Sequence, residues 1–95
     1  MGIVTRDKDA FMTTVEIYTT FSCPYCHAAK SLLRKKRAMF TEIDVGGDPD
    51  LRRAMTSRAG GSRTVPQIFI NGQHVGGCDE LYALDQEGGL EPLLA

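Results

Sequence analysis

The chain has 95 residues, with 11 basic and 12 acidic side chains and a formal net charge of −1. This length supports one domain with a single core, and the near-neutral balance argues against a function based on a broad basic surface, such as nucleic-acid or anionic-membrane binding. We expect a cytoplasmic protein, because no apolar stretch is long enough to span a membrane and no secretory signal is evident. In that reducing compartment three cysteines are not expected to form a disulfide framework.

Residues 1–14 show no sustained hydrophobic period and are expected to form a flexible N-terminal lead-in to a domain at residues 15–95. A natural start at Met12 would make the residues before it an addition from cloning. The β-rich run Val15–Thr19 is the first predicted strand. We expect it at the centre of a sheet, because both of its faces carry side chains suited to burial.

The sequence SCPYCH at residues 22–27 separates this strand from a predicted helix. Ser22 is the expected helix cap, and Pro24 suits the first turn because its missing N–H costs nothing there. Two cysteines separated by two residues at such a junction are typical of a redox pair. Unpaired backbone N–H groups and the helix dipole should hold Cys23 as a thiolate, the form that attacks disulfides. Cys26, one turn further in, is expected to be buried and protonated and to act as the resolving thiol.

Apolar positions at helical spacing extend this helix to Leu33, and the basic residues at 34–37 follow where cations offset the dipole. The alternating segment 39–45 is the second predicted strand, joined to the first by a right-handed crossover. Asp48 and Pro49 are expected to begin the second helix, as its cap and its first residue.

The segments 64–70 and 73–75 are predicted to form an antiparallel hairpin, because the Asn-Gly pair between them suits a type I′ turn. Asp79 is then expected to cap a third helix, followed by a short C-terminal end. The element order β-α-β-α-β-β-α predicts an α/β fold with a four-stranded mixed sheet flanked by helices on both faces.

Three motifs occur in a fixed order along these elements. They are Cys23-Pro24-Tyr25-Cys26 after the first strand, Thr64-Val65-Pro66 before the third and Gly76-Gly77-Cys78-Asp79 after the fourth. Together they resemble the glutaredoxin family, in its small bacterial dithiol class, over nearly all of the chain from residue 15 to residue 94. The resemblance implies a thioredoxin fold with Pro66 in the cis form facing the cysteine pair. It also implies a glutathione-dependent oxidoreductase that reduces protein disulfides and glutathione mixed disulfides through Cys23 and Cys26.

The same resemblance implies a glutathione site. The Val65 backbone would bind the cysteinyl residue of glutathione, while the Cys78 backbone N–H and the Asp79 carboxylate would bind its γ-glutamyl end. Expected partners are glutathione as co-substrate and disulfide-bonded or glutathionylated proteins, with a monomeric chain, no metal, no nucleic acid and no membrane. The residues predicted to bind glutathione are Tyr25, Thr64, Val65, Pro66, Gly77, Cys78 and Asp79.

The chain departs from the family at one position that bears on charge. Many members carry a lysine three residues before the first active-site cysteine, where it can meet the glycine carboxylate of glutathione, and here that position is Thr20. We expect Arg58 or Arg63 to supply the missing cation.

Other functions fit parts of the pattern less well. Cys23 to His27 is formally the C-x-x-C-H motif of c-type haem attachment, but such proteins are mostly helical and exported. A zinc site of Cys23, Cys26, Cys78 and a histidine lacks the usual two close ligand pairs. The alternatives that share the family resemblance are a carrier that binds a [2Fe–2S] cluster with glutathione, and a redoxin that depends on thioredoxin reductase.

Overall fold

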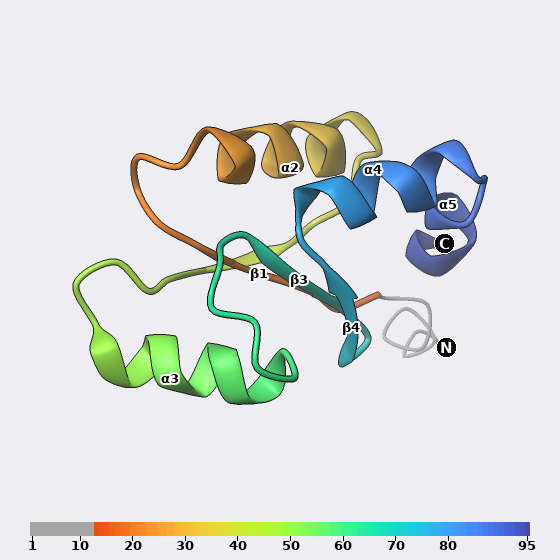
Figure 1. The fold of residues 1–95 in the computed structure, drawn as a ribbon. Helices are drawn as coiled ribbons and strands as arrows, with labels where there is room; N and C mark the ends of the chain where they lie inside the picture. The colour runs from red at the N-terminus through yellow and green to blue at the C-terminus, as the bar shows by residue number, and fades with distance from the viewer. Residues whose placement is uncertain (1–12) are drawn as a thin grey trace, which may run out of the picture.

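The computed structural model describes residues 13–95 (Figure 1). The expectations for residues 1–12, including a start at Met12, lie outside the described residues, and the domain boundary at residue 15 stays a prediction.

Thr14 exchanges hydrogen bonds with the hairpin turn. The Asn71 N–H donates to the Thr14 carbonyl at 2.7 Å, and the Thr14 N–H donates to Asn71 Oδ1 at 3.0 Å.

A four-stranded mixed sheet forms the centre of the molecule, in the order β2-β1-β3-β4. β1 pairs in parallel with β2 and antiparallel with β3, and β3 pairs antiparallel with β4. The prediction of a mixed sheet with Val15–Thr19 in its interior is therefore confirmed. The strands are β1 (Val15–Thr19), β2 (Thr41–Asp44), β3 (Gln67–Ile70) and β4 (Gln73–Gly76).

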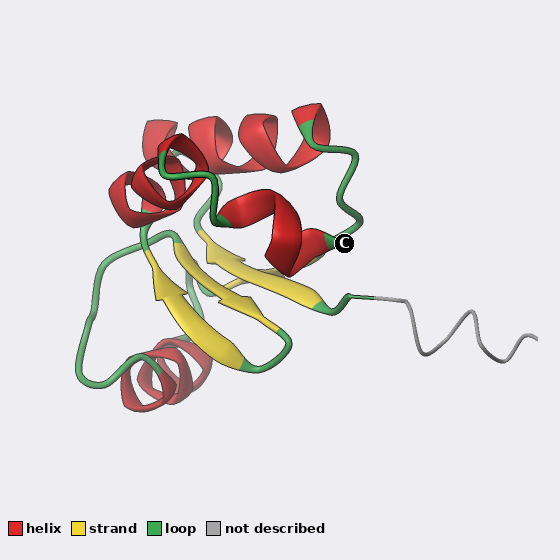
Figure 2. Ribbon diagram, turned by 90° about the vertical axis from the view of Figure 1, so that its right-hand side faces the viewer, coloured by secondary structure: helices red, strands yellow, loops and turns green. Residues whose placement is uncertain are grey.

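Helices cover both faces of this sheet, as the element order predicted (Figures 1 and 2). The helices α2 (Pro24–Lys35) and α4 (Cys78–Gln86) lie on one face, together with α5 (Leu90–Leu94), and α3 (Pro49–Arg58) lies on the other. The short end of the chain is thus a helix, which the sequence pattern did not indicate. No helix within residues 13–95 is long and apolar enough to cross a membrane.

The strand residues divide between two hydrophobic clusters because alternate side chains point to opposite faces of a sheet. Ile17 and Ile68 pack with Leu33 of α2 on one face, and Tyr18 and Phe69 pack with α3 on the other. Each fully buried Leu or Ile contributes about 1.5–3 kcal/mol, so these two clusters hold the three layers together.

The hairpin turn has the predicted geometry. Asn71 and Gly72 adopt φ values of 52° and 80°, the positive values that a type I′ turn requires at both central residues. The turn brings β4 back beside β3, and the chain then enters α4 on the same face as α2 (Figure 1). Because β1 and β4 are both antiparallel to β3, the helices that follow them, α2 and α4, begin at the same end of the sheet.

Candidate redox site

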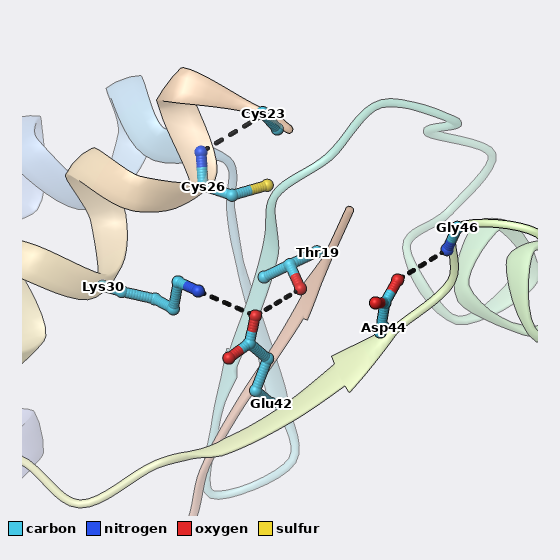
Figure 3. Close-up of polar contacts among 7 residues, drawn as sticks. All are labelled: Thr19, Cys23, Cys26, Lys30, Glu42, Asp44 and Gly46. Carbon is cyan, nitrogen blue, oxygen red and sulfur yellow. Dashed lines mark hydrogen bonds and ion pairs between the residues drawn. The ribbon is translucent and has the colours of Figure 1, made fainter. Parts of the chain in front are cut away.

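Cys23 is the N-cap of α2, and its backbone is extended, with φ −88° and ψ 115°. Its Sγ atom accepts a hydrogen bond from the Cys26 backbone N–H at 3.3 Å (Figure 3). The expectation that Ser22 caps this helix is therefore wrong, because the sulfur of Cys23 takes the capping place with Pro24 as the first helical residue. The sulfur in this position lies at the positive end of the helix dipole, beside backbone N–H groups that have no partner within the helix.

Cys26 lies one turn further into α2 and is completely buried. Burial, together with the hydrogen bond to Cys23, raises the pKa of Cys26 from 9.0 to about 12. The Cys26 thiol therefore keeps its proton at neutral pH, while Cys23 is half-buried and accessible. The two cysteines are unpaired, as is Cys78.

A cavity of about 450 Å³ opens beside the cysteine pair, within the size range of small-molecule sites. Cys23 Sγ donates to the Val65 carbonyl at 3.7 Å, which ties the reactive sulfur to the wall of the cavity. All of the residues predicted from the sequence to bind glutathione line this cavity, and one residue that was not predicted joins them. The lining residues are Tyr25, Thr64, Val65, Pro66, Gly77, Cys78, Asp79 and Glu80.

Two loops approach closely at the floor of this cavity. The Val65–Pro66 peptide bond is cis, as the resemblance implied, and Pro66 is buried. A Cβ atom on Gly77 would lie 3.2 Å from the Pro66 carbonyl oxygen, a tight contact that a glycine avoids. The start of α4 can therefore lie directly against the loop that carries Val65.

The start of α4 differs from the expected pattern. Gly77 is the N-cap and Cys78 the first helical residue, so the expectation that Asp79 caps the helix is wrong. The capping interaction comes from Glu80, whose Oε1 accepts a hydrogen bond from the Gly77 N–H at 2.7 Å. An acidic residue three positions after a cap is the signal that could have identified Glu80. Asp79 is left exposed on the first turn, where its carboxylate is available to a ligand.

The third cysteine also lies at this turn. Burial raises the pKa of the Cys78 thiol, and the neighbouring Asp79 carboxylate raises it further. The Cys78 thiol is therefore a poorer nucleophile than an exposed thiol. Its backbone N–H, in contrast, lies in the first turn of α4, where N–H groups are available to a ligand.

The two arginines considered for the glycine carboxylate lie in different settings. Arg58 donates to Glu16 Oε1 at 2.7 Å and to the Tyr18 hydroxyl at 3.0 Å, and its guanidinium stacks 4.0 Å from the Phe69 ring centre. Arg63 is exposed, two residues before Val65.

Arg63 lines a second, larger cavity of about 960 Å³ between the loop after β2 and α3. The reactive sulfur does not line this cavity, but the segment from Arg63 to Val65 connects it to the cavity beside Cys23. Arg52, which sequence analysis did not identify, lies in the same cavity and donates to the Arg63 carbonyl at 2.9 Å. Both arginines therefore bring positive charge to the larger cavity, next to the segment that leads to Val65.

No group of three or more His, Cys, Asp or Glu side chains within residues 13–95 is arranged to hold a metal ion.

Comparison with known proteins identifies the relatives of this chain. The family model described as Glutaredoxin matches residues 15–75. The chain is 57% identical to glutaredoxin 3 of Escherichia coli K12 over 83 residues, which covers 87% of this chain and 99% of that protein. These matches favour a thiol–disulfide oxidoreductase over the alternatives of a [2Fe–2S] carrier or a thioredoxin-reductase-dependent redoxin.

Solved structures with the same architecture include the solution structure of a glutaredoxin from Brucella melitensis, with a TM-score of 0.77 and 55% identity over 87% of this chain and 89% of that one. A crystal structure of a buckwheat glutaredoxin–glutathione complex has a TM-score of 0.79 and 28% identity, covering 94% of this chain and 84% of the buckwheat chain. The expected thioredoxin fold is therefore confirmed.

Proposed function

The chain belongs to the glutaredoxin family and is a thiol–disulfide oxidoreductase, and from this premise we propose that glutathione is its specific co-substrate. We propose that Cys23 is the nucleophile and Cys26 the resolving thiol. The substrates are then glutathione mixed disulfides and protein disulfides, and glutathione supplies the electrons for both.

The reaction on a glutathione mixed disulfide needs Cys23 alone. Its thiolate attacks the glutathione sulfur, a Cys23–glutathione disulfide forms, and the substrate leaves as a thiol. A second glutathione then attacks the glutathione sulfur of this adduct, which releases oxidised glutathione and regenerates the Cys23 thiolate. For protein disulfides Cys26 attacks the Cys23–substrate disulfide, and two glutathione molecules then reduce the resulting Cys23–Cys26 disulfide.

The observation that carries this proposal is the cavity of about 450 Å³ beside Cys23. Its size suits a tripeptide, and its walls offer the backbone groups of Val65 and Cys78 and the exposed Asp79 carboxylate. We propose that the Val65 backbone pairs with the cysteinyl residue, as an extended ligand pairs with a strand edge. The γ-glutamyl carboxylate would bind at the start of α4, where backbone N–H groups attract anions, and its ammonium group would meet Asp79.

The glycine carboxylate of glutathione completes this binding mode, and we assign it to Arg63. The Arg58 side chain already donates hydrogen bonds to Glu16 and Tyr18. Arg63 is exposed next to Thr64, and its backbone carbonyl accepts a hydrogen bond from Arg52. We expect Arg63→Ala to raise the apparent KM for a glutathione mixed disulfide about twofold to fivefold, the effect of an exposed ion pair worth up to about 1 kcal/mol. Arg37→Ala removes the same charge at the far end of α2 and is the control. An unchanged KM would remove this role from Arg63.

Two further proposals follow from the same chemistry. Because the reaction needs a compartment that supplies reduced glutathione, we propose that the protein acts in the cytoplasm. Because one chain carries both cysteines and the proposed binding cavity, we propose that it works as a monomer.

The test is to compare two electron donors. We expect turnover of a small glutathione mixed disulfide with glutathione, NADPH and glutathione reductase, and none with NADPH and thioredoxin reductase. Cys23→Ser should abolish turnover of this substrate, and Cys26→Ser should retain it while losing activity on protein disulfides. Turnover with thioredoxin reductase alone, or equal loss in the Cys26→Ser variant on both substrates, would overturn the proposal.

A further inference from the structure

An ion pair lies between α2 and the sheet, close to the cysteine pair. Lys30 Nζ donates to Glu42 Oε2 at 2.8 Å, and the Thr19 hydroxyl donates to the same oxygen at 2.7 Å (Figure 3). Thr19 is buried, and only 12% of the Lys30 side chain is exposed. Glu42 on β2 thus holds the lysine ammonium against the sheet, and Thr19 on β1 holds the Glu42 carboxylate in place.

This ammonium lies on the same side of α2 as the buried cysteine. Cys26 and Lys30 are four residues apart in the helix, so their side chains are neighbours on one face. Both side chains project from α2 toward the strands that carry Thr19 and Glu42 (Figure 3). The capping cysteine, Cys23, lies one turn toward the N-terminus.

The groups around this cysteine act in opposite directions. Burial, the largest cause, and the neighbouring Cys23 raise the pKa of Cys26, while the Lys30 ammonium lowers it by a smaller amount, so that the net value is about 12. Lys30 and Thr19 together lower the pKa of Glu42, so the anchoring carboxylate stays ionised at neutral pH. Among ionisable side chains, Cys23 and Lys30 are the ones that act on the Cys26 thiol.

Stability alone is a weak reason for this arrangement. A partly exposed ion pair contributes little to the free energy of unfolding, because desolvation offsets most of the attraction. The proposed reaction supplies a stronger reason. When a protein substrate is bound to Cys23 as a mixed disulfide, Cys26 must develop negative charge in a buried place, and a fixed cation beside it favours that charge.

We propose that Lys30 is a positioning residue for the resolving step, held by Glu42 and Thr19 so that its ammonium group stabilises the Cys26 thiolate as it attacks. This inference rests on the proposed function. In the step, the Cys26–Cys23 disulfide bond forms and the bond between Cys23 and the substrate sulfur breaks. The substrate leaves as a thiol, taking up the proton that Cys26 loses, so no other oxidant or reductant takes part. Lys30 remains protonated throughout.

The proposal makes the two activities of the enzyme respond differently to one substitution. Lys30→Gln should slow reduction of a protein disulfide such as insulin about threefold, the net effect of a one-unit rise in the Cys26 pKa, which lowers the thiolate fraction about tenfold and raises the nucleophilicity of the remaining thiolate about threefold. It should leave turnover of a small glutathione mixed disulfide unchanged, because that route does not use Cys26. Lys30→Arg keeps the charge and should retain most of the protein-disulfide activity. Lys35→Gln removes the same charge from the exposed end of α2 and is the matched control.

A second measurement separates the electrostatic role from a structural one. Iodoacetamide alkylation of Cys26 in a Cys23→Ser/Cys78→Ser background should be about threefold slower with Lys30→Gln at every pH between about 7 and 10.5, because the pKa of Cys26 lies above this range and the loss of thiolate is then the same at each pH. If Lys30→Gln does not fold, Glu42→Gln, which releases the ammonium group without removing it, should give a smaller loss on protein disulfides alone.

Equal losses on both substrates, or an unchanged rate of Cys26 alkylation, would show that Lys30 only supports the fold and would overturn the inference. An unchanged protein-disulfide activity in Lys30→Gln would do the same. Failure of the wild-type chain to use glutathione at all would instead refute the proposed function.

Discussion

The burial of Cys26 leads to a quantitative prediction about how hard its proton is to remove. A thiol with an ordinary pKa of 9.0 is ionised to about 1% at pH 7, and a thiol with a pKa of about 12 to about 0.001%, a thousandfold difference. Burial is the largest cause of the shift, so most of it should persist when Cys23 is replaced. The prediction can therefore be tested in a variant in which Cys26 is the only thiol.

The variant is Cys23→Ser/Cys78→Ser, and the assay is the rate of alkylation by iodoacetamide between pH 7 and pH 10.5. Because only the thiolate reacts, the logarithm of the rate should rise with slope one across this whole range, without a plateau. The matched variant, Cys26→Ser/Cys78→Ser, presents Cys23 alone, and its half-buried, accessible sulfur should react faster than that of Cys26 across the range. A plateau for Cys26 at or below pH 9 would show that burial does not hold its proton, and would refute the reasoning.

Other expectations concern stability. Leu33→Ala removes a completely buried side chain between α2 and the sheet and should lower the free energy of unfolding in urea by about 2–5 kcal/mol. Gly76→Ala should lower the free energy of unfolding by about 1–3 kcal/mol in the same assay, because Gly76 has a φ of 125° and a Cβ there would lie 2.8 Å from the Glu80 side chain. An unchanged free energy of unfolding would contradict this. Because the pKa of Cys26 is higher in the folded state, its contribution to the free energy of unfolding is complete below about pH 9 and falls as the pH rises toward 12. In Cys26→Ala the free energy of unfolding should therefore depend less on pH in that range.

Much of the fold was predictable because local signals agreed with the final packing. The Asn71-Gly72 pair satisfies a turn that needs two positive φ angles, and the Asp48-Pro49 pair begins α3 as cap and first residue, with Asp48 Oδ1 accepting from the Leu51 N–H at 3.0 Å. The strand at Val15–Thr19 is interior, as expected from side chains suited to burial on both of its faces. These features depend on neighbours in the sequence, so they can be recognised without the structure.

The misassigned helix starts show where local rules compete. Ser22 and Asp79 are both good caps by residue type, but the chain adopts the extended cap conformation one or two residues away, at Cys23 and Gly77. At α2 the Cys23 sulfur accepts a hydrogen bond from the Cys26 N–H. At α4 the Glu80 carboxylate, which lies within the helix, accepts a hydrogen bond from the Gly77 N–H. Residue preference alone does not distinguish these neighbouring registers.

The remaining features of the site depend on contacts between distant segments. Residues 25, 64–66 and 77–79 meet in one cavity because β3 lies beside β1, and before the structure only the family resemblance indicated that Pro66 faces the cysteine pair. The hydrogen bond from Arg52 to the Arg63 carbonyl joins residues 11 positions apart in the chain. The ion pair of Lys30 with Glu42 joins residues 12 positions apart. Neither has a sequence signature, because each depends on how a helix is placed against a loop or strand.

The central claim is that one sulfur, that of Cys23, carries the glutathione during turnover. The direct test is to treat the reduced Cys26→Ser variant with oxidised glutathione and to locate the added tripeptide by peptide mass spectrometry. The account predicts one glutathione per chain, attached to Cys23, and its complete removal by reduced glutathione. Attachment at Cys78, or no adduct at all, would contradict it.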